Sequence, residues 1–283
     1  MKFTKLQGAG NDFILIETDD NGRNWASLAR DICRRRFHIG ADGILLLMPS
    51  TTADYRMRIF NADGSEAEAC GNGLRCLVSY IISREVGNSD ITRLLIETAS
   101  GVRETRISRG RGAPAIQVGL GRPQFEASAI PVTLPKDGAG IVDINKVLRI
   151  PVTVADLDIT LHLVSMGNPH AIHFIDTPVA DFPLARIGLE IENHRCFPQR
   201  TNFEIAHRIK NGQLEARVWE RGVGETLACG SGAAAIAVAA RKLGLSGDRT
   251  DIRLPGGTLN VEWDGEGELM LGGPTEIVCT GEF

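Results

Sequence analysis

The sequence predicts an α+β protein built from two similar halves that face each other across a cleft. One stretch occurs twice without a gap: residues 58–73 and 217–232 each read as a strand, a glycine-rich turn, a cysteine and the start of a helix. The two cysteines, Cys70 and Cys229, are 229 − 70 = 159 residues apart, and Asn11 and Asn168 follow at 168 − 11 = 157. Repetition in step along the chain indicates an internal duplication, and ligand sites favour clefts between such halves.

The composition is that of an ordinary globular protein. The chain has 283 residues, of which 43% are hydrophobic and 23% charged, and a net charge of −4 with no basic stripe argues against a nucleic-acid surface. No apolar run approaches the roughly 20 residues that span a bilayer, and residues 1–15 show no signal-peptide pattern. We therefore expect a cytoplasmic protein with no membrane partner. Its six cysteines should stay reduced, and their spacing indicates no metal site.

In the first half, strands alternate with two helices. Residues 25–33 show helical spacing, and residues 72–86 form an apolar helix of the kind that a sheet surrounds. Residues 8–12 are expected to form a turn. The strands expected in this half span residues 3–6, 13–17, 44–48, 55–60, 94–98, 102–107 and 115–118.

The second half repeats this order after a crossover rich in glycine and proline at residues 119–140. The helix expected at residues 231–243 is mostly alanine, and small side chains allow close contact with a surrounding sheet. The strands expected here span residues 152–155, 161–165, 171–175, 214–219, 252–254, 258–263, 268–272 and 275–280.

The paired cysteines indicate acid–base chemistry at a carbon atom. A cysteine directly before a helix lies at the positive end of the helix dipole, which favours its thiolate, and the glycines after it leave N–H groups open to an anion. A carboxylate held by two such helix ends would place its α-carbon between two sulfurs. One thiolate could remove the α-proton while the opposite thiol delivers a proton to the other face, which inverts the stereocentre. Two thiolates about 7 Å apart would repel by about 2.4 kcal/mol at an effective dielectric constant of about 20, so we expect one thiol and one thiolate.

Other residues near the repeated stretches are candidates for the same site. His170 follows a Gly-Asn-Pro turn and is a candidate neighbour of a cysteine. Glu220 and Arg221 stand where the first half has Asn61 and Ala62, which suggests that one end of the cleft binds a charged group. The remaining cysteines lack the paired context and are read as semi-buried thiols: Cys33, Cys76, Cys196 and Cys279.

At these residues the sequence resembles the diaminopimelate epimerase family. The resemblance extends over nearly the whole chain. The segment that begins at Cys70 and the segment that begins at Glu220 are highly specific when they occur together. The matching segments are Gly8-x-Gly10-Asn11-Asp12-Phe13, Cys70-Gly71-Asn72-Gly73-x-Arg75-Cys76, Phe60-Asn61-Ala62-Asp63-Gly64-Ser65, Met166-Gly167-Asn168-Pro169-His170, Thr201-Asn202-Phe203 and Glu220-Arg221-Gly222-x-Gly224-Glu225-Thr226-x-Ala228-Cys229-Gly230-Ser231-Gly232.

The resemblance implies a cofactor-independent enzyme that interconverts L,L- and meso-2,6-diaminopimelate for lysine and peptidoglycan-precursor synthesis, commonly as a homodimer. It implies two pseudo-symmetric halves, each a barrel-like sheet wrapped around a central helix, with the active site in the cleft between them. The last strand would return to the first half, which gives one domain of residues 1–120 and 272–283 with Cys70, and another of residues 121–271 with Cys229.

The resemblance also implies a role for each matching residue. Cys70 and Cys229 would be the acid–base pair, and His170 and Glu220 would tune them. The substrate contacts implied are Asn11, Asn61, Gly71, Asn72, Asn168, Asn202, Glu220, Arg221, Gly230 and Ser231. Some family members carry Gln where this chain has Gly43, so that substrate contact is missing or replaced by water, and Gly43 is left out of the site.

Three other classes of function compete with this interpretation. A proline racemase or hydroxyproline epimerase would also use two cysteines but usually lacks the asparagine and arginine set. A thiol redox protein would use Cys70 and Cys229 as a disulfide switch. A binding module for amino acids would not exchange the α-hydrogen with solvent.

Overall fold

The computed structural model describes residues 1–68, 70–84, 91–110, 114–134, 142–209 and 212–283. Ala69 of the repeated stretch, residues 85 and 86 of the predicted helix and residues 135–140 of the predicted crossover lie outside the described residues. The chain divides into two compact units, which we call unit 1 (residues 1–119 and 272–283) and unit 2 (residues 120–271).

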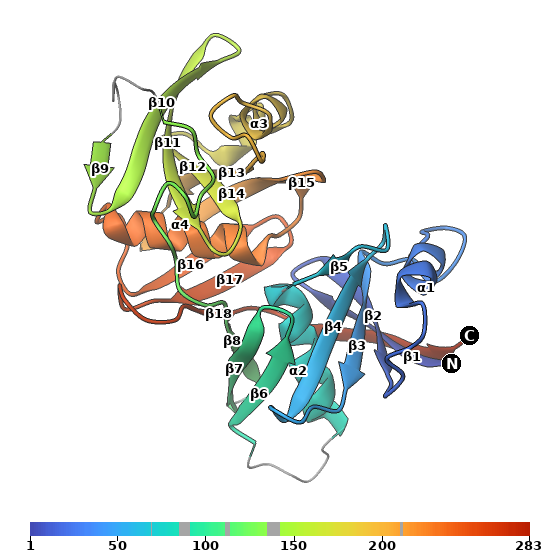
Figure 1. The fold of residues 1–283 in the computed structure, drawn as a ribbon. Coiled ribbons are helices and arrows are strands. Elements are labelled where there is room, and N and C mark those ends of the chain that lie inside the picture. The colour runs from blue at the N-terminus through green and yellow to red at the C-terminus, as the bar shows by residue number, and fades with distance from the viewer. Residues whose placement is uncertain (69, 85–90, 111–113, 135–141, 210–211) are drawn as a thin grey trace. The chain divides into compact units, whose positions relative to one another are not determined.

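Unit 1 is a mixed sheet with two helices, α1 (Trp25–Ile32) and α2 (Gly71–Arg84) (Figure 1). Its strands are β1 (Lys2–Gly8), β2 (Asn11–Glu17), β3 (Gly43–Met48), β4 (Tyr55–Asn61), β5 (Glu66–Ala67), β6 (Arg93–Thr98), β7 (Gly101–Ser108), β8 (Ala115–Gly119) and β19 (Glu276–Glu282). The sheet runs β19-β1-β2-β3-β4-β6-β7-β8, with the short β5 also paired to β4. The β2–β3 and β4–β6 pairs are parallel and the other pairs are antiparallel.

Unit 2 contains the helices α3 (Leu184–Glu192) and α4 (Gly230–Lys242) and the short 3₁₀ helix η1 (Val179–Asp181) (Figure 1). Its strands are β9 (Val142–Ile144), β10 (Val147–Val154), β11 (Leu157–Ser165), β12 (Pro169–Ile175), β13 (Asn202–Arg208), β14 (Leu214–Glu220), β15 (Gly224–Thr226), β16 (Arg249–Leu254), β17 (Gly257–Glu262) and β18 (Met270–Gly272), whose last residue belongs to unit 1. The sheet runs β9-β10-β11-β12-β13-β14-β16-β17, with β15 also paired to β14.

The two sheets repeat each other strand by strand and in register. Ile44 pairs with Phe60 across β3 and β4, and Phe203 pairs with Trp219 across β13 and β14, 203 − 44 = 159 residues later. The order of antiparallel and parallel neighbours from β19 through β7 is the same as the order from β10 through β17. The predicted α+β class with two pseudo-symmetric halves is confirmed.

Each sheet wraps around one helix, as predicted. In unit 1, α2 packs against β1, β2, β3, β4, β8 and β19, and its residues from Asn72 through Val78 are buried. In unit 2, α4 packs against β11, β12, β13, β16 and β17, and its residues from Gly232 through Ala240 are buried. Alanine along α4 lets the strands approach the helix closely, which keeps the interior dense.

Both chain ends lie in unit 1. β19 pairs antiparallel with β1, with Lys2 opposite Glu282, and the N–H of Phe283 donates to the carbonyl of Met1 at 3.0 Å. The two ends are therefore side by side (Figure 1). Unit 1 is completed by the last strand of the chain.

Two turns are tighter than predicted. The predicted strand at residues 152–155 includes Ala155, but Ala155 and Asp156 form a two-residue turn with φ of 47° and 64°. The predicted turn at residues 8–12 is likewise reduced to Ala9 and Gly10, with φ of 53° and 84°. Both turns have the left-handed geometry that matches the twist of a hairpin, so the flanking strands continue up to them.

The helix α3 was not predicted from the sequence. It buries Leu184, Ile187 and Ile191 against strands β10, β13 and β14. Gly188 lies against the ring of Trp219, so that a Cβ added at residue 188 would be 2.6 Å from Trp219 Cγ. The glycine lets the helix approach the indole.

We expect Gly188→Ala to lower the free energy of unfolding by about 1–3 kcal/mol, because the methyl group overlaps the partly buried ring of Trp219. This outweighs the roughly 1 kcal/mol by which alanine favours a helix. Urea unfolding measures the change. Gly247→Ala is the control, because a Cβ at Gly247 meets no atom within 4 Å of the described structure. A Gly188→Ala protein as stable as the wild type would contradict this packing.

Candidate active site

Cys70 directly precedes α2, and the start of that helix is directed at its sulfur. The N–H of Gly73 donates to Cys70 Sγ at 3.3 Å, and the N–H of Leu74 donates to the Cys70 carbonyl at 2.8 Å. Cys70 is half-buried, and Gly71 is the first residue of the helix. The helix end therefore presents N–H groups beside the thiol, where they favour negative charge.

Two predicted substrate contacts, Asn11 and Asn72, lie next to Cys70. Asn72 Nδ2 donates to Asn11 Oδ1 at 3.4 Å, and Cys70 Sγ is 3.9 Å from the same oxygen. Asn11 Nδ2 donates to Asp42 at 2.7 Å. Asn61, at the end of β4, is exposed and donates to Ser65 Oγ at 2.9 Å. The contacts of these residues join Asn11 and Asn72 to Cys70 and connect Asn61 to its own turn.

Cys229 occupies the matching place in unit 2 as the N-cap of α4. The N–H of Gly232 donates to Cys229 Sγ at 3.3 Å, the distance also found at Cys70. Ser231 Oγ is 3.4 Å from the sulfur, and Asn168 Nδ2 lies 3.5 Å from Ser231 Oγ. Gly230 is the first residue of the helix. Cys229 is more deeply buried than Cys70, with 7% of its surface exposed.

His170 is connected to this cluster through Asn168. Its Nε2 lies 3.0 Å from Asn168 Oδ1, and its Nδ1 lies 2.6 Å from Glu204 Oε1. His170 and Glu204 are both fully buried. Both ring nitrogens of His170 therefore have a hydrogen-bond partner inside the protein.

The turn that carries Glu220 and Arg221 is held by side chains on three sides. Thr226 Oγ1 donates to Glu220 at 2.5 Å, and the N–H of Arg221 donates to Asn202 Oδ1 at 2.9 Å. Glu192 on α3 accepts from the N–H of Gly222 at 2.8 Å. The turn is therefore fixed in place with respect to α3 and β13.

Burial raises the pKa of Cys229 well above its usual value, and the carboxylates of Glu220 and Glu204 raise it further. The hydrogen bonds from Ser231 and Gly232 act in the opposite direction. The helix end thus favours the thiolate in the predicted direction, but the loss of solvent outweighs it, so that the net shift of the Cys229 pKa is upward. Burial also raises the pKa of Glu220 and of Glu204.

The sequence interpretation missed Glu204, Glu192 and Arg75. Each is a charged residue with 4% or less of its surface exposed. A buried charge is costly without a partner, so such residues are candidates for a role in a site. Arg75 lies in one of the matching segments, which gave a signal, and Glu204 could have been found as a single charge between apolar residues of a strand.

Gly43 is the first residue of β3. A Cβ at this position would lie 2.6 Å from the backbone oxygen of Phe60, so this backbone leaves no room for a side chain. A glutamine side chain, which some family members carry at this position, would therefore fit here only if β3 or β4 shifted.

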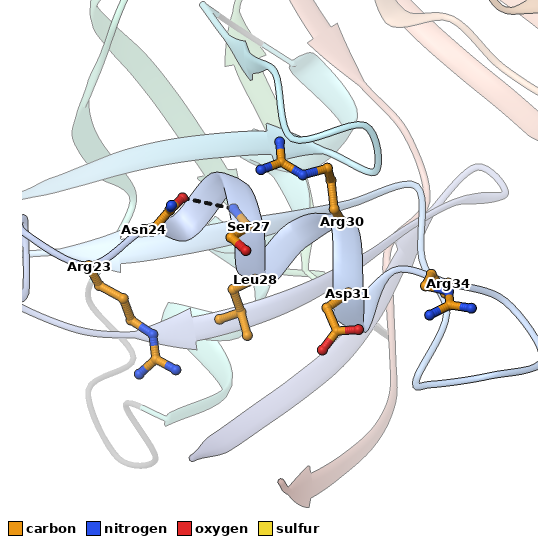
Figure 2. A pocket seen from close by; sticks show the side chains of 7 residues that line it. All are labelled: Arg23, Asn24, Ser27, Leu28, Arg30, Asp31 and Arg34. Atoms are coloured by element: carbon orange, nitrogen blue, oxygen red, sulfur yellow. Dashed lines mark hydrogen bonds between the residues drawn. The ribbon is translucent and has the colours of Figure 1, made fainter.

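A surface pocket lies elsewhere, along α1, and contains none of the predicted site residues. Its lining residues come from α1 and the positions that flank it, and the Asn24 side chain caps the helix by accepting from Ser27 N at 2.9 Å (Figure 2). The lining consists of Arg23, Asn24, Ser27, Leu28, Arg30, Asp31 and Arg34.

Within the described residues, no helix combines the length and the apolar character that a membrane span needs. Over the same part of the chain, no three His, Cys, Asp or Glu side chains are grouped so that they could hold a metal ion.

Comparison with known structures shows the fold. The chain superposes on a PhzF-family phenazine biosynthesis protein of Bacillus anthracis with a TM-score of 0.69 and 15% identity, covering 100% of this chain and 98% of the other. It superposes on a hydroxyproline epimerase of Agrobacterium vitis with a TM-score of 0.70 and 12% identity, covering 99% and 91%.

Comparison of sequences shows the family. The diaminopimelate epimerase family profile matches residues 3–126 and 162–278. The chain is 42% identical to a diaminopimelate epimerase of Halothermothrix orenii, over 100% of this chain and 98% of that protein. It is also 42% identical to a diaminopimelate epimerase of Microcystis aeruginosa, over 99% and 98%. The resemblance stated from the sequence is confirmed, and the chain belongs to the diaminopimelate epimerase family.

Proposed function

We propose that the protein is a diaminopimelate epimerase, an isomerase that interconverts L,L- and meso-2,6-diaminopimelate without a cofactor. The observation that carries this proposal is the full-length similarity to diaminopimelate epimerases at 42% identity. The two register-matched cysteines at the starts of α2 and α4 support it, because inversion of a stereocentre needs one proton-transfer group on each face of the carbon.

In the proposed reaction, unit 1 supplies Cys70 and unit 2 supplies Cys229. One sulfur takes the α-proton as a thiolate, and the other donates its proton to the opposite face. The reacting carboxylate is bound by the N–H groups at Gly71, Asn72, Gly230 and Ser231. As the α-proton leaves, the negative charge left on the α-carbon is shared with the carboxylate oxygens, so these N–H groups bind it more strongly. Asn11 lines the site beside Cys70.

The far end of diaminopimelate carries a second ammonium and carboxylate. We assign its carboxylate to Arg221 and its ammonium group to Glu220, with Asn61, Asn168 and Asn202 as further hydrogen-bonding groups. This assignment is supported by the fixed turn that presents Glu220 and Arg221. His170 and Glu220 tune the thiols, since both are joined to the Cys229 cluster.

The protein would act in lysine and peptidoglycan-precursor synthesis in the cytoplasm, as a homodimer. Its six cysteines are all free, which suits a reducing compartment.

The test is incubation of L,L-diaminopimelate with the enzyme in heavy water. We expect one deuterium at the inverted α-carbon, because the proton that is delivered comes from a thiol in exchange with solvent. Mass spectrometry and NMR measure the incorporation. L-proline is the comparison substrate and should gain no deuterium. Deuterium incorporation into proline but not into diaminopimelate would contradict the proposal and indicate a proline-type epimerase. If neither compound gained deuterium, the proposal would also be contradicted, and the result would indicate a protein that binds amino acids without reacting with them.

A further inference from the structure

Glu192 is a buried charged residue that the proposed reaction does not use. It is the last residue of α3 and has 4% of its surface exposed. Its Oε1 accepts from the N–H of Gly222 at 2.8 Å and from Arg200 Nη1 at 3.1 Å. Its Oε2 accepts from Trp219 Nε1 at 2.7 Å. Both oxygens of this carboxylate are therefore engaged, and one of them is bonded to the backbone of the turn that carries Arg221.

The bond from Gly222 links α3 to this turn. α3 packs against β14 and β15, the two strands that the turn joins (Figure 1). The turn is closed by the N–H of Val223, which donates to the Glu220 carbonyl at 3.0 Å, and Gly222 has a φ of 79°. The N–H of Gly222 takes no part in that closure and is directed at Glu192. The carboxylate thus fixes the tip of the turn to a helix that is itself packed on the sheet.

Arg221 lies at this tip and is held at both of its ends. Its N–H donates to Asn202 Oδ1 at 2.9 Å, and its Nη1 donates to the carbonyl of Gln199 at 3.2 Å. Gln199 directly precedes Arg200, whose guanidinium bonds to Glu192. A shift of the turn would therefore move the Arg221 guanidinium, because its backbone and its side chain are both attached to parts of unit 2 that Glu192 connects.

The duplicated unit forms the same turn without this anchor. At the offset of 159 residues, the turn of unit 2 corresponds to residues 61–64, and there the N–H of Gly64 donates to the Asn61 carbonyl at 2.9 Å. The turn therefore does not need a buried carboxylate in order to form. The side chains that hold the turn in unit 2 are replaced in unit 1 by residues without a side-chain oxygen or nitrogen: Glu192 by Cys33 (192 − 159 = 33), Asn202 by Gly43 (202 − 159 = 43) and Thr226 by Ala67 (226 − 159 = 67).

This difference points to a ligand rather than to the fold. Burial of a charge costs stability unless its partners offset the cost, and in unit 1 the matching Cys33 packs in an apolar cluster instead. The anchored turn is the one that presents a charged pair, Glu220 and Arg221, where unit 1 has Asn61 and Ala62. A charged pair held in place before the ligand arrives binds it more tightly, because less freedom is lost on binding.

We propose that Glu192 is a positioning residue for substrate binding: it holds the turn of unit 2 so that Arg221 meets the carboxylate at the far end of the substrate. This inference rests on the proposed function, which assigns that carboxylate to Arg221. The far end keeps its charges throughout the reaction, so its contacts are equally strong before proton transfer and during it. Loss of Glu192 should therefore raise KM with little change in kcat. Loss of folded protein would instead lower the apparent kcat and leave KM unchanged.

The experiment compares two variants of similar size. Glu192→Leu has no acceptor, whereas Glu192→Gln keeps one oxygen, which can face the donors of Gly222 and Arg200. We expect KM for L,L-diaminopimelate to rise about tenfold in the leucine variant and by no more than about threefold in the glutamine variant. In both variants kcat should stay within about threefold of the wild type. Glu192→Ala replaces the leucine variant if leucine is not tolerated.

Trp219→Phe is the matched control. It removes the hydrogen bond to the other oxygen of Glu192 and keeps an aromatic ring against Gly188, so it should lower the thermal midpoint but leave KM within about twofold. An equal rise of KM in Trp219→Phe and Glu192→Leu would overturn the proposal, since general loosening of the cluster would explain both. So would an unchanged KM in Glu192→Leu, or failure of both the leucine and the alanine variant to fold.

The contact with the turn can be measured without substrate. In protein labelled with ¹⁵N-glycine, NMR follows the exchange of the Gly222 N–H with heavy water, which should be at least about tenfold faster in Glu192→Leu than in the wild type and unchanged in Trp219→Phe. Equal exchange in the wild type and the leucine variant would overturn the proposal even if the enzyme acts on diaminopimelate. Wild-type protein that does not turn over diaminopimelate would contradict the proposed function, while the exchange rates would still decide whether Glu192 holds the turn.

Discussion

Replacing either Cys70 or Cys229 with alanine is expected to lower the rate of stereoinversion of diaminopimelate by at least about 1000-fold. Each alanine removes the only proposed proton-transfer group on one face of the α-carbon, and no second group in the mechanism can replace it. The loss should be in the turnover rate, since the helix-end N–H groups that bind the carboxylate remain. Circular dichroism detection of the product stereoisomer measures the rate.

The control for these variants is another cysteine of the same chain. Cys279 on β19 is exposed, and Cys279→Ala should keep its activity within about twofold, as expected for a surface substitution. Both active-site variants should unfold cooperatively at a midpoint close to that of the wild type. If either variant retained a tenth of the wild-type turnover, the two-thiol mechanism would be wrong.

Replacing Glu204 with alanine is expected to lower the free energy of unfolding by about 3–5 kcal/mol, because it leaves the buried Nδ1 of His170 without a partner. The side chain that is removed is fully buried and also fills the space beside α4, where Glu204 Oε1 is 3.0 Å from the position of a Cβ on Gly232. Denaturant unfolding measures the loss.

Two further variants make this test specific. Glu204→Gln keeps the shape and an acceptor for His170, so its loss should be clearly smaller than that of the alanine variant. Glu190→Ala removes an exposed carboxylate from α3 and should change the stability by no more than about 0.5 kcal/mol. Equal stability of Glu204→Ala and Glu190→Ala would show that the His170–Glu204 pair does not hold the site together.

The duplication made most of the fold predictable. Because the strands around Cys70 and Cys229 repeat at a constant offset, each half supported the assignment of the other, and both central helices were found. The helix α3 was missed because Gly188 interrupts its apolar face and Pro183 offers no side-chain cap. Residue 188 is a glycine because the ring of Trp219, which is distant in sequence, leaves no room for a Cβ atom there.

The candidate site was predictable where it depends on local geometry. A cysteine before a helix with glycine three residues later produces the same N–H to sulfur contact in both units. The upward shift of the Cys229 pKa was not predictable, because it depends on burial, on Glu220 and on Glu204, which reaches the site only through the pairing of β12 with β13. Helix dipoles follow from sequence, whereas desolvation follows from tertiary packing.

The pairing of β1 with β19 has a consequence for how the protein is made. All strands and helices of unit 2 lie in one continuous stretch of chain, whereas unit 1 is split between residues 1–119 and 272–283. During synthesis, β1 leaves the ribosome long before its partner β19 has been translated, so this pair of strands cannot form until residues 272–283 are available. Until then one edge of β1 is open to chaperones or to pairing with another nascent chain.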